Sequence, residues 1–322
     1  SYRAEKFGRK EKRKVEGTFD EKIDEKQEKK PMVVLTGPTA VGKTKLSLSL
    51  AEAIGGEIIS ADSMQVYRHM DIGSAKIRPS GMQGIPHHMI DILEPCEPFN
   101  VVIFQERCRE CLEGIYERGH IPIVTGGTGF YIQALLKDID FTENEENTAY
   151  RKELEQLAEE KGAEYLHGML QQVDEEAAEK IHANNIKRTI RALEFFELTG
   201  KKISEHNTEE GEKKSAYQSC YFVLNDDREK LYARIEQRID EMLAEGLVEE
   251  VRALQKMGCT RNLVSMQGLG YKEILAYLDG ETDLETAVEV LKRDTRHFAK
   301  RQLTWFRREK DVYWVDKEKF DY

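Results

Sequence analysis

The sequence has no run of about 18 consecutive apolar residues, so it predicts no helix that could cross a membrane. Its first residues also lack the short apolar segment of a secretory signal. Cysteine is scarce, with five residues among 322, which is too few for a disulfide-stabilised scaffold of this length. Together these absences predict a protein of a reducing, cytoplasmic compartment that makes no membrane contact.

Basic residues are not in excess, since 49 Lys and Arg stand against 60 Asp and Glu and give a net charge of −11. This balance argues against a protein covered in positive charge for binding nucleic acid. An acidic protein can still bind RNA through a local patch, so the distribution of charge is more informative than its total. The 39% of hydrophobic residues fits a globular chain, and the length suggests about two domains.

Two short patterns resemble metal sites but are incomplete. Cys108 and Cys111 form a C-x-x-C pair, but it lies in a helix-like segment and no second pair completes a zinc site. His87 and His88 are adjacent, and no third ligand is suitably spaced. We expect both pairs to serve packing, with the histidines at the entry to a strand.

Apolar segments and helix-like segments alternate from Met32 onward. Strands are expected at 32–36, 57–62, 88–93, 121–127, 217–225 and 311–316, with helices between them and through 226–309. This alternation predicts an α/β fold with a parallel sheet. The expected divisions are a charged, disordered or frayed tail at 1–30, a core at 31–137 and 216–322 with helices at its C-terminal end, and a helical insertion domain at 138–215.

The segment GPTAVGKT fits the phosphate-loop pattern G-x-x-x-x-G-K-[ST] and lies between an expected strand and an expected helix. Its backbone N–H groups can form an anion nest, the lysine adds positive charge, and the threonine hydroxyl suits Mg²⁺. The motif predicts a P-loop NTPase-like sheet flanked by helices that binds a di- or triphosphate with Mg²⁺. The expected phosphate-binding residues are Gly37, Thr39, Ala40, Val41, Gly42, Lys43 and Thr44, with Thr44 as the metal ligand.

Polar residues follow two other strands at the point where each strand ends. Asp62 and Ser63 follow one strand, and Thr128 in TGGTGFY follows another. Ligands of an open parallel sheet bind beyond the carboxyl ends of its strands, so these side chains should face the crevice of Lys43. Asp62 could bind magnesium, act as a general base or cap a helix. Thr128 could contact the substrate or belong only to a tight turn.

The segment RDTRHFAKRQLTWFRR at 293–308 holds six Lys or Arg and a single acidic residue. At helical spacing Arg293, Arg296 and Lys300 share a face, whereas a solvated amphipathic helix usually alternates its charges. We therefore interpret this segment, including Arg301, as a contact surface for an RNA backbone.

A second basic group lies in the expected insertion. Lys187, Arg188 and Arg191 share a helix face and could clamp a diphosphate or bind nucleic acid. Arg234 and Arg238 form a weaker pair, because pairing with acidic residues of the same helix explains them equally well.

These motifs together resemble one family, the bacterial tRNA dimethylallyltransferases, also called tRNA isopentenyltransferases. The resemblance extends in order over almost everything after residue 31, through the segments GPTAVGKT, ADSMQVYR, HHMIDI, VTGGTGFY, IKRTIRALE, GLGYKEI and TRHFAKRQLTWFR. It implies transfer of a dimethylallyl group from dimethylallyl diphosphate to N6 of the adenosine 3′ of the anticodon. The helical insertion and the C-terminal helices would then hold the anticodon stem-loop, with the target base flipped into a channel.

The resemblance also implies roles for residues. Lys43 would neutralise the departing diphosphate with Mg²⁺ and an arginine, Arg188 or Arg191. Asp62, with an ordinary pKa near 4, would remove the N6 proton after the new bond begins to form, and Thr128 would help to orient the base. The expected tRNA-binding residues are Asp62, Ser63, Met64, Gln65, Thr128, Lys187, Arg188, Arg191, Arg293, Arg296, Lys300 and Arg301. We expect a monomer.

Three other functions remain open from the sequence. A transferase acting on free adenine nucleotides would share the phosphate loop and Asp62 but would not need residues 293–308. A small-molecule kinase would use ATP and ignore dimethylallyl diphosphate. An RNA-binding protein without catalytic activity would not need an intact Lys43, Thr44 and Asp62.

Overall fold

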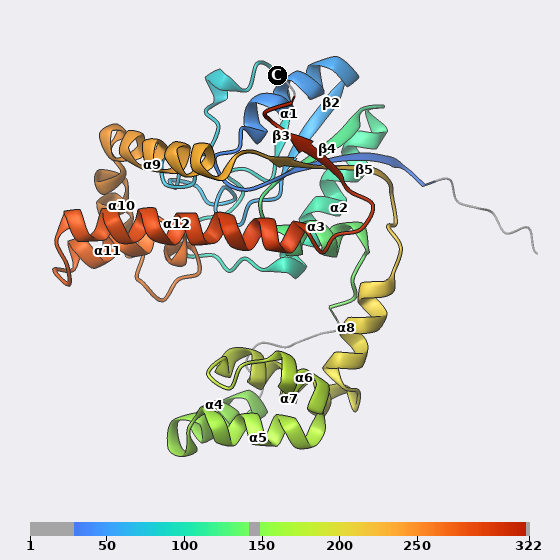
Figure 1. The fold of residues 1–322 in the computed structure, drawn as a ribbon, viewed down its shortest axis with the longest axis vertical. Coiled ribbons are helices and arrows are strands. Elements are labelled where there is room, and N and C mark those ends of the chain that lie inside the picture. Colours follow the sequence, from blue (N-terminus) through green and yellow to red (C-terminus); the bar gives the residue numbers. More distant parts are fainter. Residues whose placement is uncertain (1–28, 142–148, 320–322) are drawn as a thin grey trace, which may run out of the picture.

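The computed structural model describes residues 29–141 and 149–319 (Figure 1). The tail predicted at 1–30 lies outside the described residues, apart from its last two positions. Each helix within the described ranges is too short or too polar to cross a lipid bilayer.

The centre of the fold is a sheet of six parallel strands in the order β3-β2-β4-β1-β5-β6, which confirms the predicted α/β class. The innermost strands are rich in buried aliphatic residues, as expected when helices cover both faces of a parallel sheet. The strands are β1 (Pro31–Thr36), β2 (Gly56–Ser60), β3 (His87–His88), β4 (Ile121–Gly126), β5 (Gln218–Asn225) and β6 (Tyr313–Asp316).

The register of the sheet brings three loops together at one edge. Thr36 at the end of β1 pairs with Gly126 at the end of β4, and Ser60 at the end of β2 pairs with Thr125. The Ala61 N–H continues the alignment by donating to the Thr125 carbonyl at 2.7 Å. The segments that follow β1, β2 and β4 therefore start side by side, as the position of their strand ends predicts.

Helices cover this sheet and bury its core (Figure 1). Cys108 is fully buried in that core, and burial raises the pKa of its thiol well above the usual value, which supports the packing role expected for the C-x-x-C pair. The helices of this part are α1 (Lys43–Ile54), α2 (Val101–Glu117), α3 (Gly129–Leu136), α9 (Arg228–Glu245), α10 (Leu247–Lys256), α11 (Tyr271–Leu278) and α12 (Leu284–Phe306).

The strand predicted at 88–93 is wrong in extent, since β3 contains only His87–His88. Met89 and Asp91 have positive φ angles of 65° and 55°, which do not fit an extended strand. At Leu93 the chain forms an isolated parallel bridge to Tyr67, which lies outside the six strands.

The segment predicted as a helical insertion folds around a hydrophobic cluster of its own, which includes Leu154, Leu166, Leu170 and Leu193. Figure 1 shows these helices as a separate body below the sheet. They are α4 (Ala149–Lys161), α5 (Ala163–Val173), α6 (Glu175–Lys180), α7 (Ile186–Thr199) and α8 (Ile203–Glu212).

The two ends of this helical body are joined to each other where it meets the core. The Ala216 N–H, just before β5, donates to the Leu136 carbonyl at the end of α3 at 2.7 Å. A little further out, the Asp140 N–H donates to Glu210 Oε2 at 2.9 Å. The chain thus leaves the core and returns to it at nearly the same point.

A buried carboxylate lies at the opposite end of the strands from the three loops. Glu57 in β2 is 1% exposed and accepts two hydrogen bonds of 2.8 Å from Arg118, while ring nitrogens of His88 and His120 lie 2.6 Å from its oxygens. The hydrogen bond from Arg118 contributes most to lowering the pKa of Glu57 to about 2. His88 therefore belongs to an ionic cluster, and the described residues contain no group of three or more His, Cys, Asp or Glu side chains arranged to hold a metal ion.

Candidate active site

The phosphate loop follows β1 and leads into α1, which it enters through glycine. Gly42, the N-cap of α1, has a φ of 105° and Gly37 has a φ of 148°, both in a region that favours glycine. A Cβ atom at Gly37 would lie 2.7 Å from the Leu224 carbonyl oxygen, so the loop also needs glycine there for space. Ala40 adds a third left-handed residue, with a φ of 63°. Alternating conformations of this kind turn successive N–H groups toward one side and form an anion nest.

Lys43 lies at the base of this loop. Its Nζ donates to the carbonyl oxygens of Gly37 at 3.0 Å and Pro38 at 2.8 Å. Desolvation, aided by repulsion from Arg238 and opposed by attraction to Asp62, lowers the pKa of Lys43 to about 7. The ammonium therefore interacts electrostatically with both of these groups, one of each sign.

Helix α9 supplies two arginines to this loop, a role that the sequence analysis did not assign. Arg234 donates from Nε to the Ala40 carbonyl at 3.0 Å and forms an ion pair of 2.5 Å with Asp226. Arg238 is close enough to lower the pKa of Lys43, and burial in turn lowers the pKa of Arg238 itself. Pairing within the helix, the alternative considered for these residues, does not account for the Arg234 bond to Ala40 or for the effect of Arg238 on Lys43.

Asp62 follows β2 and lies close enough to Lys43 for the two charges to interact. Its Oδ1 accepts hydrogen bonds from the N–H groups of Met64 at 2.8 Å and Gln65 at 3.2 Å, so the capping alternative is part of its role. Among the described residues, no hydrogen bond involves Oδ2. Burial raises the pKa of Asp62, while those two hydrogen bonds and the charges of Lys43 and Lys76 oppose the shift. The expectation of an ordinary pKa was therefore wrong, because it ignored the desolvation of this carboxylate.

The residues after Asp62 are held by their own contacts. The Gln65 side chain accepts from Ser60 Oγ at 2.8 Å and donates to the Ser74 carbonyl at 3.2 Å. The Met64 side chain packs closely on Gly268. A Cβ atom at Gly268 would lie 2.6 Å from the Met64 sulfur. Ser63, between Asp62 and Met64 in the sequence, is partly exposed.

Thr128 precedes α3 and is partly exposed toward the same edge of the sheet. Its hydroxyl does not cap the helix, and no hydrogen bond ties it to any other part of the described chain. The tight-turn alternative accounts for the neighbouring glycines. It does not account for the Thr128 hydroxyl, which has no hydrogen-bond partner among the described residues. The geometry is thus compatible with a contact to a ligand.

Helix α12 connects the two glycine-rich loops through one side chain. Gln302 is 6% exposed, accepts from the Thr39 N–H at 2.9 Å and donates to the Gly127 carbonyl at 3.1 Å. Three residues later, the Trp305 ring occupies the space that a Cβ atom at Gly129 would need. One face of α12 therefore packs directly on these two loops.

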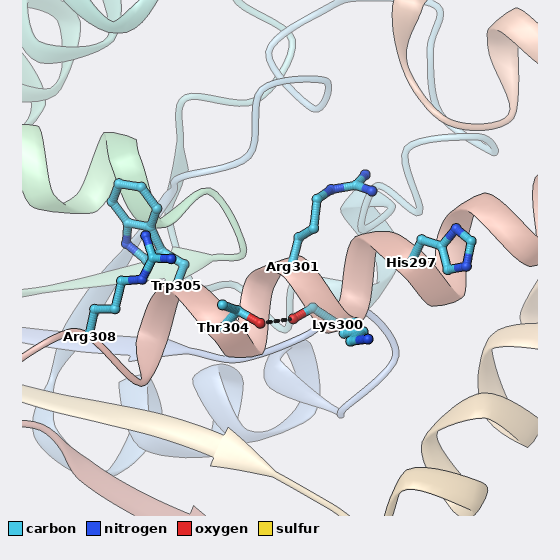
Figure 2. Close-up of a pocket in the computed structure, with 6 residues that line it drawn as sticks. All are labelled: His297, Lys300, Arg301, Thr304, Trp305 and Arg308. Atoms are coloured by element: carbon cyan, nitrogen blue, oxygen red, sulfur yellow. Dashed lines mark hydrogen bonds between the residues drawn. The ribbon is translucent and has the colours of Figure 1, made fainter. Parts of the chain in front are cut away.

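The exposed side of α12 lines an open basic pocket of about 490 Å³. Figure 2 shows the residues that line it, which are His297, Lys300, Arg301, Thr304, Trp305 and Arg308. Two other predicted RNA contacts are already engaged within the protein. Arg293 bonds to Asp294 at 3.0 Å, and Arg296 bonds to Glu236 at 2.6 Å because α9 packs against α12. The available cations of this helix therefore lie nearer its C-terminal end than expected.

The structure does not bring Lys187, Arg188 and Arg191 to the phosphate loop. They lie exposed on α7, which packs against α4, α5 and α8 in the helical body. Figure 1 places that body at the end of the molecule opposite α1. A diphosphate held by the loop would meet the arginines of α9 instead.

Comparison with known proteins identifies relatives over most of the chain. Residues 65–309 match the IPP transferase family, and residues 31–92 match the isopentenyl transferase family. The chain is 63% identical to the tRNA dimethylallyltransferase of Lachnoclostridium phytofermentans, over 90% of this chain and 93% of that protein. It is 52% identical to the enzyme of the same name from Geobacillus kaustophilus, over 88% and 90% of the two chains.

Solved structures agree with these relatives. The tRNA isopentenylpyrophosphate transferase of Bacillus halodurans superposes with a TM-score of 0.69 at 44% identity, covering 92% of each chain. A eukaryotic dimethylallyltransferase acting on tRNA superposes with a TM-score of 0.78 at 32% identity, covering 89% of this chain and 74% of that one.

Proposed function

This chain belongs to the tRNA dimethylallyltransferase family, and from that membership we propose that it transfers a dimethylallyl group from dimethylallyl diphosphate to N6 of an adenosine in tRNA. In this reaction the allylic C–O bond breaks, diphosphate leaves, N6 bonds to the allylic carbon, and one N6 proton is released. The proposed target is the adenosine 3′ of the anticodon.

One observation carries the proposal. The loops after β1, β2 and β4 start side by side at one edge of the sheet, so the phosphate loop, the Asp62 carboxylate and the unbonded Thr128 hydroxyl lie at that same edge. An anion-binding loop suits the donor and its leaving group, and Asp62 and Thr128 suit a nucleobase. The same edge is adjacent to the basic pocket of α12 through Trp305, which packs beside Gly129.

The departing diphosphate gains negative charge as the C–O bond breaks, and groups that neutralise this charge lower the barrier. We assign this role to the N–H groups of the phosphate loop, to Lys43, and to Arg238 in place of Arg188 or Arg191. Thr44 suits an oxygen ligand of Mg²⁺, since its hydroxyl is exposed at the start of α1 and bonds to no described residue. A bound Mg²⁺ would supply further positive charge to the leaving group.

The amino group of adenine is a weak acid, and it becomes strongly acidic only as it bonds to the allylic carbon. A carboxylate can then accept the proton late in the reaction. We assign this step to Asp62, whose Oδ1 is held by two backbone N–H groups. The raised pKa makes it a stronger base than an ordinary aspartate. Thr128 would orient the base.

For the tRNA, we propose that the anticodon stem-loop spans the two bodies of the molecule. Lys300 and Arg301 of α12 and the exposed cations of α7 would contact its phosphates. We propose that the enzyme acts in the cytoplasm, in keeping with its five free cysteines, and as a monomer, which sedimentation in solution tests.

The direct test is incubation with labelled dimethylallyl diphosphate, Mg²⁺ and bulk tRNA, followed by nucleoside analysis. We expect N6-modified adenosine from the wild type. Asp62→Asn should reduce turnover about 10²- to 10⁴-fold with little change in tRNA affinity, because it removes the proton acceptor and keeps the shape. Glu106→Gln, which changes an exposed carboxylate on α2, is the matched control. Wild-type turnover in the Asp62→Asn variant would exclude Asp62 as the base.

The same assay separates the alternative functions. A kinase would consume ATP and leave dimethylallyl diphosphate intact, and a transferase for free nucleotides would modify AMP in preference to tRNA. Either result would overturn the proposal.

A further inference from the structure

The segment that follows the catalytic carboxylate is anchored by an acidic side chain from a distant helix. Glu250 of α10 accepts three backbone hydrogen bonds, from Asp71 N at 3.1 Å and Ile72 N at 2.8 Å through Oε2, and from Gly73 N at 3.1 Å through Oε1. Charge-assisted bonds of this type are stronger than neutral ones. One side chain thereby fixes three consecutive residues of a loop that lies 177 to 179 positions earlier in the sequence.

Tyr271 of α11 completes this anchor. Its hydroxyl donates to Glu250 Oε1 at 2.7 Å, and its ring packs on the loop so closely that a Cβ atom at Gly73 would come within 2.6 Å of it. Tyr271 is fully buried. The sequence motif GLGYKEI, which contains this tyrosine, thus contributes a contact with the loop of residues 71–73.

The anchored loop connects to the candidate active site through one further residue. The Ser74 carbonyl accepts from the Gln65 side chain at 3.2 Å, and the same side chain accepts from Ser60 at 2.8 Å. The Gln65 N–H in turn donates to Asp62 Oδ1 at 3.2 Å. The path from the anchor to the proposed base thus consists of hydrogen bonds joined by the peptide link between Gly73 and Ser74 and by the covalent structure of Gln65.

On its other side the segment is tied down by Lys76. Its ammonium donates to the Tyr67 carbonyl at 2.7 Å and to the carboxylates of Asp71 at 2.7 Å and Asp91 at 2.6 Å. Lys76 thus ties the segment to its own neighbourhood, and Glu250 with Tyr271 fixes it to α10 and α11.

We propose that Glu250 is a positioning residue for the acceptor half of the active site, acting through residues 71–74 and Gln65 on Asp62. It does not touch the phosphate loop, which is held instead by Arg234 and Gln302. The inference rests on the proposed function, because the acceptor half is defined by the reaction that Asp62 serves. The proposal predicts that loss of Glu250 lowers the turnover with tRNA and leaves the binding of dimethylallyl diphosphate unchanged.

The experiment compares Glu250→Ala, Glu250→Gln and Tyr271→Phe with the control Glu249→Gln, which changes the adjacent exposed carboxylate. A displacement of about 1 Å at reacting groups can cost about 100-fold in rate. We expect Glu250→Ala to lower kcat by about 10- to 100-fold with tRNA, while the Kd for dimethylallyl diphosphate stays within about twofold of the wild-type value. Tyr271→Phe should show a smaller loss of the same kind, because three of the four bonds remain.

Glu250→Gln retains the shape and one carbonyl acceptor, so partial recovery of kcat relative to Glu250→Ala is expected. Hydrogen exchange gives a readout that does not depend on activity: amides 62–66 should exchange faster in Glu250→Ala, and those of the phosphate loop should not.

Unchanged kcat in Glu250→Ala would overturn the inference. Equal losses of donor binding and kcat would also overturn it, because they would indicate a general structural role for Glu250. If Glu250→Ala does not fold, the same criteria apply to Tyr271→Phe. If the wild type modifies no RNA, the proposed function fails, and the exchange pattern alone then decides whether Glu250 holds this segment.

Discussion

Lys43 carries a charge that changes near neutral pH, because desolvation and Arg238 lower its pKa to about 7. Only the protonated form attracts a diphosphate, so affinity for dimethylallyl diphosphate should fall as the pH rises above about 7. Each pH unit above the pKa lowers the protonated fraction up to about tenfold. Calorimetric titration between pH 6 and 9 would measure this effect.

The donor itself also ionises in this range, so the informative quantity is the difference between the wild type and Lys43→Met. The variant should bind more weakly and lose the additional pH dependence. Parallel pH curves for the two proteins would contradict the assignment of Lys43.

Single residues were predictable from sequence where a motif fixes their position. The spacing of the phosphate loop identified Lys43, and the strand-end position identified Asp62. For Arg238 the sequence left open whether it binds a ligand or pairs within its helix, because the helical periodicity of α9 does not show which neighbouring element its side chain meets. The raised pKa of Asp62 was missed for a related reason, since burial depends on the packed structure.

At the scale of elements, α12 combines a face packed on the loops with an exposed basic pocket. Replacing both Lys300 and Arg301 by Ala should weaken tRNA binding and reduce the slope of log K against log salt by about 1 for each phosphate that is no longer neutralised. Binding measured at several salt concentrations tests this expectation.

Lys292→Ala is the matched control, because this lysine lies on the same helix but is already bound to Asp240 at 2.6 Å. If the slope of log K against log salt is unchanged in the variant that lacks Lys300 and Arg301, the RNA must bind to another surface.

Strands were predictable as elements because short apolar runs between helix-like segments are distinctive, and β1, β4 and β5 lie close to the expected positions. The strand at 88–93 was not, because the same apolar pattern also fits an irregular segment with left-handed residues such as Met89. The buried contact of Gln302 was likewise hidden, since sequence gives its face but not its partners.

At the scale of the molecule, the helical body has a core separate from that of the sheet. Leu170→Ala removes a fully buried side chain there and should cost about 2–5 kcal/mol of that body's stability. Because the loss is local, tRNA binding should weaken while donor binding persists. Limited proteolysis and donor titration would measure the two effects.

Leu198→Ala, at a position on α7 that is 51% exposed, is the control and should leave both properties nearly unchanged. Loss of donor binding in Leu170→Ala would show that the two bodies unfold together.

Their separate cores were not predictable from hydrophobic content alone, because the sequence pattern does not show which apolar faces meet.

The hydrogen bond between Ala216 and Leu136 has a consequence beyond this protein. A polypeptide that exits and re-enters at one spot can be lengthened, shortened or swapped in between without changing how the strands are ordered. Evolution could therefore have diversified the helical insertion while the catalytic core stayed constant. A protein engineer could likewise replace the insertion with another domain at the same junction.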